Sequence, residues 1–74
     1  MAVHTLDITK EHCPMTFVKT KLALAKIAKG DTLDVLLNAG EPLANVPRSA
    51  EEQGFEILGI APVDGVIHRV SIRK

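Results

Sequence analysis

Cys13 is the one cysteine in the chain, and its type and position suit it to chemistry. It comes directly before Pro14, and proline is favoured at the first position of a helix, where its missing N–H costs nothing. The unpaired N–H groups and the positive dipole of a helix start stabilise a thiolate, which is the reactive form of cysteine. Neighbouring residues that add positive potential are Lys10, His12, Lys19 and Lys21. The alternative is that Cys13 is a small buried apolar residue, as free cysteines often are.

The residues around Cys13 exclude several kinds of cysteine chemistry. One cysteine forms no internal disulfide and no Cys-x-x-Cys redox pair, and a protease-like site needs a histidine base oriented by a third group. The side chain of His12 should diverge from that of its neighbour Cys13, while His4 and His68 belong to predicted strands. The histidines lack zinc-site spacing and the glycines form no phosphate loop, so we expect no metal and no cofactor. What remains is chemistry that one thiolate performs with a second protein, such as carrying a sulfur atom as a persulfide.

Length and composition predict a single small domain over residues 1–74, with too little chain for an active-site cleft of its own. Nine basic residues balance nine acidic ones, and aromatic residues make up only 3%, which argues against nucleic acid as the main partner. No apolar run is long enough for a membrane span, and residues 1–5 show no signal-peptide pattern. We therefore expect a soluble cytoplasmic protein, and an unpaired cysteine fits that reducing compartment.

The charge is balanced over the whole chain but not locally. Residues 1–30 contain five lysines and two acidic residues, whereas residues 31–74 contain four basic and seven acidic residues. The lysines of the predicted helix after Cys13 form either a docking face for an acidic partner or an ordinary solvated face. Arg48 is likewise either a partner contact or a solvated residue beside Glu51 and Glu52.

The first half of the chain predicts a strand, a helix and a second strand. Residues 3–8 alternate as in a short strand. Residues 15–29 contain no glycine or proline and are rich in Ala, Leu and Lys, which predicts a helix that ends at Gly30. Its expected apolar stripe consists of Phe17, Leu24, Ile27 and Ala28, widened by Val18, Leu22 and Ala25. Residues 31–38 form the second predicted strand, whose inward residues are Leu33, Val35 and Leu37.

A second helix is predicted within residues 43–53. We expect its second half to be helical, with Pro47 in the first turn and Gly54 after the end. Ser49 and Glu52 have the spacing of a capping box, but the earlier position of Pro47 indicates that the helix has already begun.

The remainder of the chain predicts a hairpin. Strands over residues 55–63 and 66–73 are joined by Asp64-Gly65, a strong hairpin signal. Strand–helix–strand links favour parallel pairs, and a hairpin is antiparallel. We therefore predict an α/β (α+β) two-layer sandwich of βαβαββ order, with a mixed four-stranded sheet and two helices on one face.

Several segments together resemble the TusA-like (SirA-like) family of small sulfur-carrier proteins. In chain order they are Leu6-Asp7-Ile8, Cys13-Pro14-Met15-Thr16, Gly30-Asp31-Thr32-Leu33, Asn45-Val46-Pro47-Arg48, Gly54-Phe55-Glu56-Ile57 and Ile72-Arg73-Lys74. The resemblance covers essentially the whole chain and implies the same two-layer sandwich. Members of the family accept sulfane sulfur on the cysteine of a Cys-Pro-x-Pro motif, which the resemblance places at Cys13 and Pro14.

Thr16 stands where the family has its second proline. An early helix position accepts Thr, whose hydroxyl offers a hydrogen bond near the sulfur. The substitution bears on which donor and acceptor are recognised.

The leading hypothesis is a sulfur carrier, a sulfurtransferase that acts through a Cys13 persulfide rather than through a substrate pocket. Its implied partners are a sulfur donor such as a cysteine desulfurase and an acceptor sulfur-relay or biosynthetic protein. One alternative is a non-catalytic regulatory or adaptor module that binds protein or RNA, as similar small sandwiches do; another is transfer of selenium rather than sulfur. The candidate supporting or partner-docking residues are Pro14, Thr16, His12, Lys10, Lys19, Lys21 and Arg48.

Overall fold

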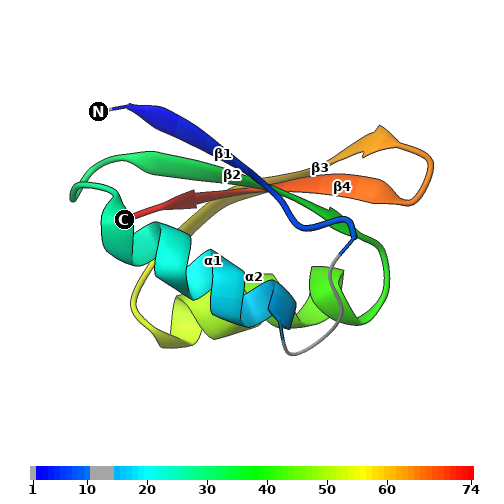
Figure 1. Ribbon diagram of the computed structural model, residues 1–74, viewed down its shortest axis with the longest axis horizontal. Coiled ribbons are helices and arrows are strands. Elements are labelled where there is room, and N and C mark those ends of the chain that lie inside the picture. Colours follow the sequence, from blue (N-terminus) through cyan, green and yellow to red (C-terminus); the bar gives the residue numbers. More distant parts are fainter. Residues whose placement is uncertain (1, 11–14) are drawn as a thin grey trace.

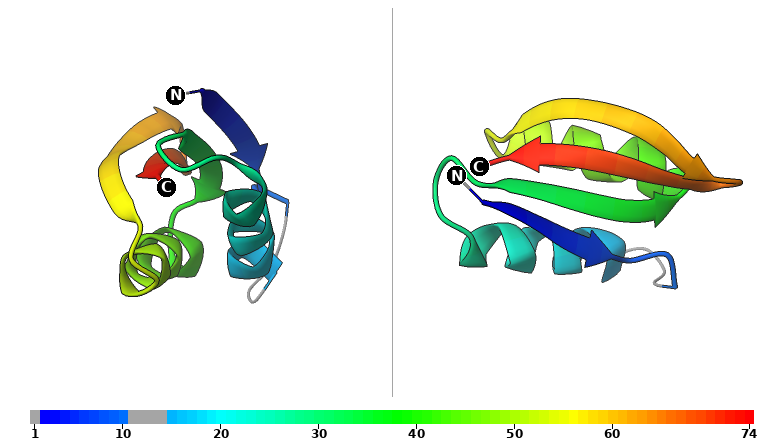
Figure 2. Two further views of the ribbon diagram at one scale, coloured as in Figure 1. Left: turned by 90° about the vertical axis from the view of Figure 1, so that its left-hand side faces the viewer. Right: turned by 90° about the horizontal axis from the view of Figure 1, so that it is seen from above.

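The computed structural model describes residues 2–10 and 15–74. In chain order the elements are β1 (Val3–Asp7), α1 (Met15–Lys26), β2 (Thr32–Asn38), α2 (Glu41–Glu52), β3 (Glu56–Asp64) and β4 (Ile67–Arg73) (Figure 1). The predicted element order is confirmed. Both helices lie on one face of the sheet (Figure 2), so the fold is the predicted two-layer sandwich.

The strands of the described residues form one mixed sheet in the order β1-β2-β4-β3. β1 and β2 are parallel, whereas β4 is antiparallel to both β2 and β3. β1 and β2 therefore end at the same edge of the molecule, where β1 leads into residues 8–14. The amino-terminal ends of these two strands lie at the opposite edge, beside both chain termini (Figure 1).

The hydrophobic core lies between the sheet and the two helices. β2 alternates strictly, and its inward residues Leu33, Val35 and Leu37 are fully buried, as predicted. The other buried apolar residues of this cluster are Ile8, Leu24, Val46, Ala50, Val70 and Ile72. Because this core is small, each of these side chains contributes a large share of the stability.

The buried stripe of helix α1 matches the predicted one only in part: Leu24 is buried and Ile27 packs against the core, as predicted. Thr16, Thr20 and Leu24 are buried at four-residue spacing. The hydroxyl of Thr20 donates to the carbonyl oxygen of Thr16 at 2.8 Å, which satisfies that polar group inside the core layer. The prediction that Val18 and Leu22 widen the apolar stripe is wrong, because these side chains are 39% and 57% exposed.

Helix α2 begins earlier than predicted. It starts at Glu41, with Pro42 in the first turn, so Pro47 lies inside the helix and is buried. The prediction that Pro47 lies in the first turn is wrong, and the capping-box spacing of Ser49 and Glu52 falls inside the helix. Pro42 already supplies the fixed φ that favours a helix start. Burial of Pro47 in the helix layer offsets the missing hydrogen bond to the preceding turn.

The end of α2 is fixed by a Schellman motif. Gly54 has a φ of +92°, a region that residues with a Cβ rarely adopt. Its N–H donates to the carbonyl of Glu51, and the N–H of Phe55 donates to that of Ala50, both at 3.0 Å. Phe55 packs against the core, so the motif also turns the chain into β3.

The β3–β4 hairpin turns one residue later than predicted. Gly65 and Val66 form the turn, and Gly65 has a φ of +53°. A glycine with positive φ at the first turn position matches a type II′ turn, which follows the twist of the flanking strands. β3 carries irregularities in register between Ile57 and Gly59 and between Pro62 and Asp64.

Candidate functional site

Cys13, Pro14 and His12 lie outside the described residues. The roles predicted for these three residues therefore stay predictions. The structure describes the chain on both sides: residues 8–10, which follow β1, and Met15, where α1 begins. Cys13 is two residues before Met15 in the chain, so these described residues are the nearest ones to the candidate nucleophile on either side in sequence.

The chain before Cys13 is anchored at Thr9. The carboxylate of Asp7 accepts hydrogen bonds from the N–H of Thr9 at 2.9 Å and from its hydroxyl at 2.7 Å. The side-chain amide of Asn38, at the end of β2, donates to the carbonyl oxygen of Thr9 at 2.6 Å. The backbone N–H of Thr9, followed by its hydroxyl, lowers the pKa of Asp7. Thr9 is thus held through three polar groups, which fixes the point from which segment 10–14 departs.

The chain after Cys13 continues into α1 with a buried Thr16. This residue is the second of the helix and is 1% exposed, so it belongs to the inner face of α1. Its position in the first turn accommodates either threonine or proline, because N–H groups in a first turn have no partner within the helix. Whether its hydroxyl lies near the sulfur concerns residues outside the described part of the chain.

The amino-terminal end of α1 favours negative charge. Its first turn, as far as the structure describes the chain, contains no acidic side chain. An anion near that end therefore experiences the helix dipole without a competing carboxylate on the same turn. This is the electrostatic setting that the sequence predicts for a Cys13 thiolate.

The basic candidates divide between this helix and other elements. Lys21 on α1 and Lys10 before it are exposed, while Lys19 is half-buried. Arg48 lies on α2, where its Nε is 3.8 Å from Glu52 in an exposed pair. Such exposed pairs contribute little to stability. The structure therefore places Lys19 and Lys21 on the helix that follows Cys13 and places Arg48 on the other helix.

The two described histidines do not form a catalytic pair. His68 lies near the hairpin, with Nδ1 3.0 Å from the carbonyl oxygen of Val66. His4 lies on β1, with Nε2 3.0 Å from the carboxylate of Asp31. In the described part of the chain, no three His, Cys, Asp or Glu residues are grouped to hold a metal ion.

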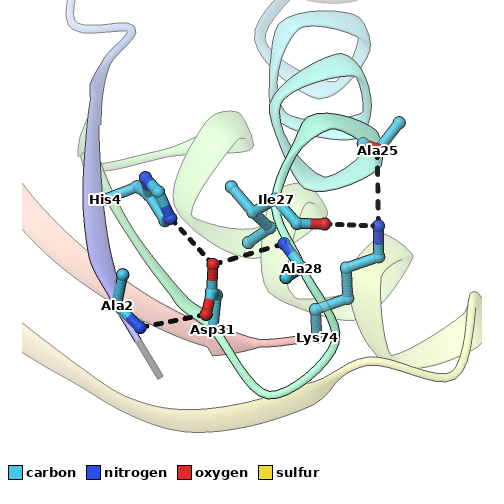
Figure 3. Close-up of polar contacts among 7 residues, drawn as sticks. All are labelled: Ala2, His4, Ala25, Ile27, Ala28, Asp31 and Lys74. Carbon is cyan, nitrogen blue, oxygen red and sulfur yellow. Dashed lines mark hydrogen bonds and ion pairs between the residues drawn. The ribbon is translucent and has the colours of Figure 1, made fainter.

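Asp31 forms a polar cluster that sequence reasoning missed (Figure 3). It is 7% exposed, and its carboxylate accepts hydrogen bonds from the backbone N–H groups of Ala2 at 2.9 Å and Ala28 at 3.2 Å. Together with His4, these contacts hold the pKa of Asp31 well below its usual range, the N–H of Ala2 having the largest effect. Beside it, the ammonium of Lys74 donates to the carbonyl oxygen of Ile27 at 2.9 Å. The cluster joins both chain ends to the end of α1, at the edge of the sheet opposite residues 8–10. The only sequence signal was an aspartate directly after Gly30.

The fold defines a small two-layer α/β protein, and comparison with known proteins gives the family. The family described as sulfurtransferase TusA matches residues 4–74, and the chain belongs to this family. It is 37% identical over 73 residues to a putative sulfur carrier protein of Archaeoglobus fulgidus, covering 99% of this chain and 83% of the relative. It is 32% identical over 71 residues to the putative sulfur carrier protein YedF of Escherichia coli, covering 96% and 91% of the two chains.

A solved structure agrees with the fold. The crystal structure of a SirA-like protein from Desulfitobacterium hafniense superimposes with a TM-score of 0.83 and 26% identity, covering 99% of this chain and 96% of that one. The predicted resemblance to the TusA-like family is thereby confirmed. Among the described residues, the helices are all too short or too polar to cross a membrane.

Proposed function

We propose that this sulfur carrier accepts sulfane sulfur on Cys13 as a persulfide and passes it to a partner protein. The observation that carries the proposal is the family match over residues 4–74, which includes Cys13-Pro14 directly before α1. The relatives named as sulfur carriers support the general role. The acid-free first turn of α1 supports the choice of Cys13 as the carrying residue.

The transfer consists of two displacements at one sulfur atom. The Cys13 thiolate attacks the outer sulfur of a donor persulfide and forms a new S–S bond. The S–S bond of the donor breaks, and its electron pair leaves with the donor cysteine as a thiolate. A thiolate of the acceptor then attacks the same outer sulfur, and Cys13 leaves as a thiolate. No external oxidant or reductant is needed, because the sulfane sulfur passes between thiolates.

The donor must approach the helix that follows Cys13. That helix exposes Lys21 and Lys26 together with Val18 and Leu22, a mixed basic and apolar surface. Such a surface fits a partner with an acidic rim, because opposite charges raise the rate of productive encounter. We propose a donor of the cysteine desulfurase type, an acceptor of a sulfur-relay or biosynthetic pathway, and action in the reducing cytoplasm, where an unpaired thiol persists.

The proposal is tested by loading the protein with sulfur. The purified chain is incubated with a cysteine desulfurase and free cysteine, and its intact mass is measured before and after treatment with a thiol reductant. We expect the gain of one sulfur atom, reversed by the reductant and absent in Cys13→Ser. An unchanged mass with several donors, for a protein whose Cys13 is readily alkylated and titrates like a free thiol, would contradict the proposal.

A further inference from the structure

The face of the sheet opposite the helices contains a hollow of about 320 Å³. Its lining comes from all four strands of the sheet, including the two outer strands β1 and β3. Gly59 and Ala61 on β3 pair with Ser71 and Arg69 on β4. A Cβ at Gly59 would meet no atom within 4 Å, so the small residues of β3 leave the space open. This face is distinct from the helix layer that contains α1.

The walls of the hollow are apolar. Val3 on β1 and Leu58 on β3 line it, and about half or more of each side chain is exposed. Two large apolar side chains around one concave site favour a ligand with an apolar group of its own, because contact removes that surface from water.

Arg69 gives the hollow its charge preference. The other two arginines each have an acidic neighbour: Arg73 donates to Glu56 at 2.6 Å, and Arg48 pairs with Glu52. In the part of the chain that the structure describes, Arg69 has no such partner and lines the hollow with its side chain exposed. A guanidinium presents its N–H groups in a planar fork that matches a carboxylate.

Asp34 makes the charge within the hollow asymmetric. It also lines the site, and its carboxylate accepts a hydrogen bond from the hydroxyl of Ser71 at 2.8 Å. Its negative charge repels a second carboxylate nearby. In the register of β2 and β4, Asp34 lies opposite Ser71, whereas Arg69 lies opposite Leu36, two residues further along β2. An acidic group is therefore directed to the Arg69 side of the hollow.

The outer strand β3 is a poor template for adding another strand. Its register is broken on both sides of the segment Gly59–Pro62, and Pro62 itself has no N–H to donate. Irregular register and proline are features that discourage pairing at the edge of a sheet. A partner segment therefore makes more favourable contacts on the concave face than along the outer edge of β3.

We propose that this hollow binds an acidic, partly apolar segment of a partner protein, with a carboxylate of that segment on Arg69. An apolar side chain of the segment contacts Leu58 and Val3. The site does not require Cys13, so a partner remains bound on the sheet face irrespective of whether the thiol carries sulfur.

The experiment is an amide-resolved NMR titration of the full chain with a short capped peptide of alternating Leu and Glu. The matched peptide has Gln in place of Glu. We expect saturable shifts at Gly59, Ala61 and Ser71, in Cys13→Ser as in the unchanged protein. Loss of an exposed ion pair should weaken binding about fivefold in Arg69→Gln. Arg48→Gln removes the same charge from the helix layer and should bind as the unchanged protein does.

Three results would overturn the proposal. One is the absence of shifts at millimolar peptide. Another is equal affinity for the Glu and Gln peptides or equal weakening in Arg69→Gln and Arg48→Gln, which would indicate unspecific attraction. The third is a set of shifts confined to the lysines of α1, which would place the acidic segment on the helix layer. None of these outcomes bears on loading of Cys13, so they leave the proposed function separately testable.

Discussion

At the scale of single residues, Thr9 is the described residue that best connects the fold to the candidate nucleophile. Asp7 and Asn38 hold its N–H, hydroxyl and carbonyl groups, and Cys13 follows four positions later. Cys13 itself was singled out from sequence by its type and its place before a proline. Asp7 and Asn38 were not, because short polar residues at strand ends are common, and the contact between Asn38 and Thr9, 29 positions apart, is visible only in three dimensions.

The Asn38→Ala substitution tests the anchoring of Thr9. It removes the amide that donates to the Thr9 carbonyl, and we expect a loss of about 1 kcal/mol in the free energy of unfolding. Urea unfolding measures this loss. The rate of Cys13 alkylation at neutral pH should also fall, because Thr9, from which segment 10–14 continues, is then held less firmly. Ser71→Ala, which loses a hydrogen bond on the open sheet face, serves as the control. An equal change of alkylation rate in both variants would show that Asn38 has no specific link to Cys13.

At the scale of elements, the sequence was most informative where burial follows a simple period. β2 alternates between apolar and polar residues, and its inward residues were predicted correctly. The predicted stripe of α1 included Leu24 and Ile27 correctly but omitted Thr16 and Thr20. These two residues count as polar in a sequence pattern, although a backbone carbonyl satisfies the Thr20 hydroxyl inside the helix layer. The start of α2 was missed because the segment contains two prolines, and only tertiary packing shows that Pro47 is tolerated within the helix.

Two leucines of α1 give a matched test of the observed stripe. Leu24 is 2% exposed and Leu22 is 57% exposed, on the same helix and two positions apart. We expect Leu24→Ala to lower the free energy of unfolding by about 3 kcal/mol, because it leaves a cavity in the core. Leu22→Ala should change it by less than about 0.5 kcal/mol. Urea unfolding followed by circular dichroism measures both, and similar losses in the two variants would contradict the burial pattern.

At the scale of the whole molecule, the polar cluster at Asp31 and residues 8–10, which follow β1, lie at opposite edges. Asp31 joins Ala2 near the amino terminus, the end of α1 and the start of β2, while Lys74 closes the same edge from the other chain end (Figure 3). One edge is thus held by a buried carboxylate, whereas residues 8–10 at the other edge lead along the chain toward the proposed carrier Cys13. Sequence alone did not predict this division, because the cluster is assembled from residues at both chain ends.

The Asp31 cluster predicts an acid-sensitive stability. The lowered pKa of Asp31 means that the folded state favours the carboxylate, so its contribution is fully present above the ordinary value of 3.8. That contribution is lost progressively as the pH falls from there toward the lowered folded-state pKa. Asp31→Asn should therefore be less stable than the unchanged protein at neutral pH, and the difference should shrink below about pH 3. A difference that stays constant across this range in urea unfolding would show that the carboxylate charge contributes nothing.

The central claim is that Cys13 carries sulfane sulfur, and cyanide tests it most directly. After loading with a desulfurase and removal of the donor, cyanide attacks the outer sulfur of a persulfide and releases it as thiocyanate, leaving the Cys13 thiolate. The account predicts one thiocyanate for each loaded chain, recovery of the original mass, and none from Cys13→Ser. Thiocyanate released equally from Cys13→Ser, or a loaded chain that releases none, would contradict it.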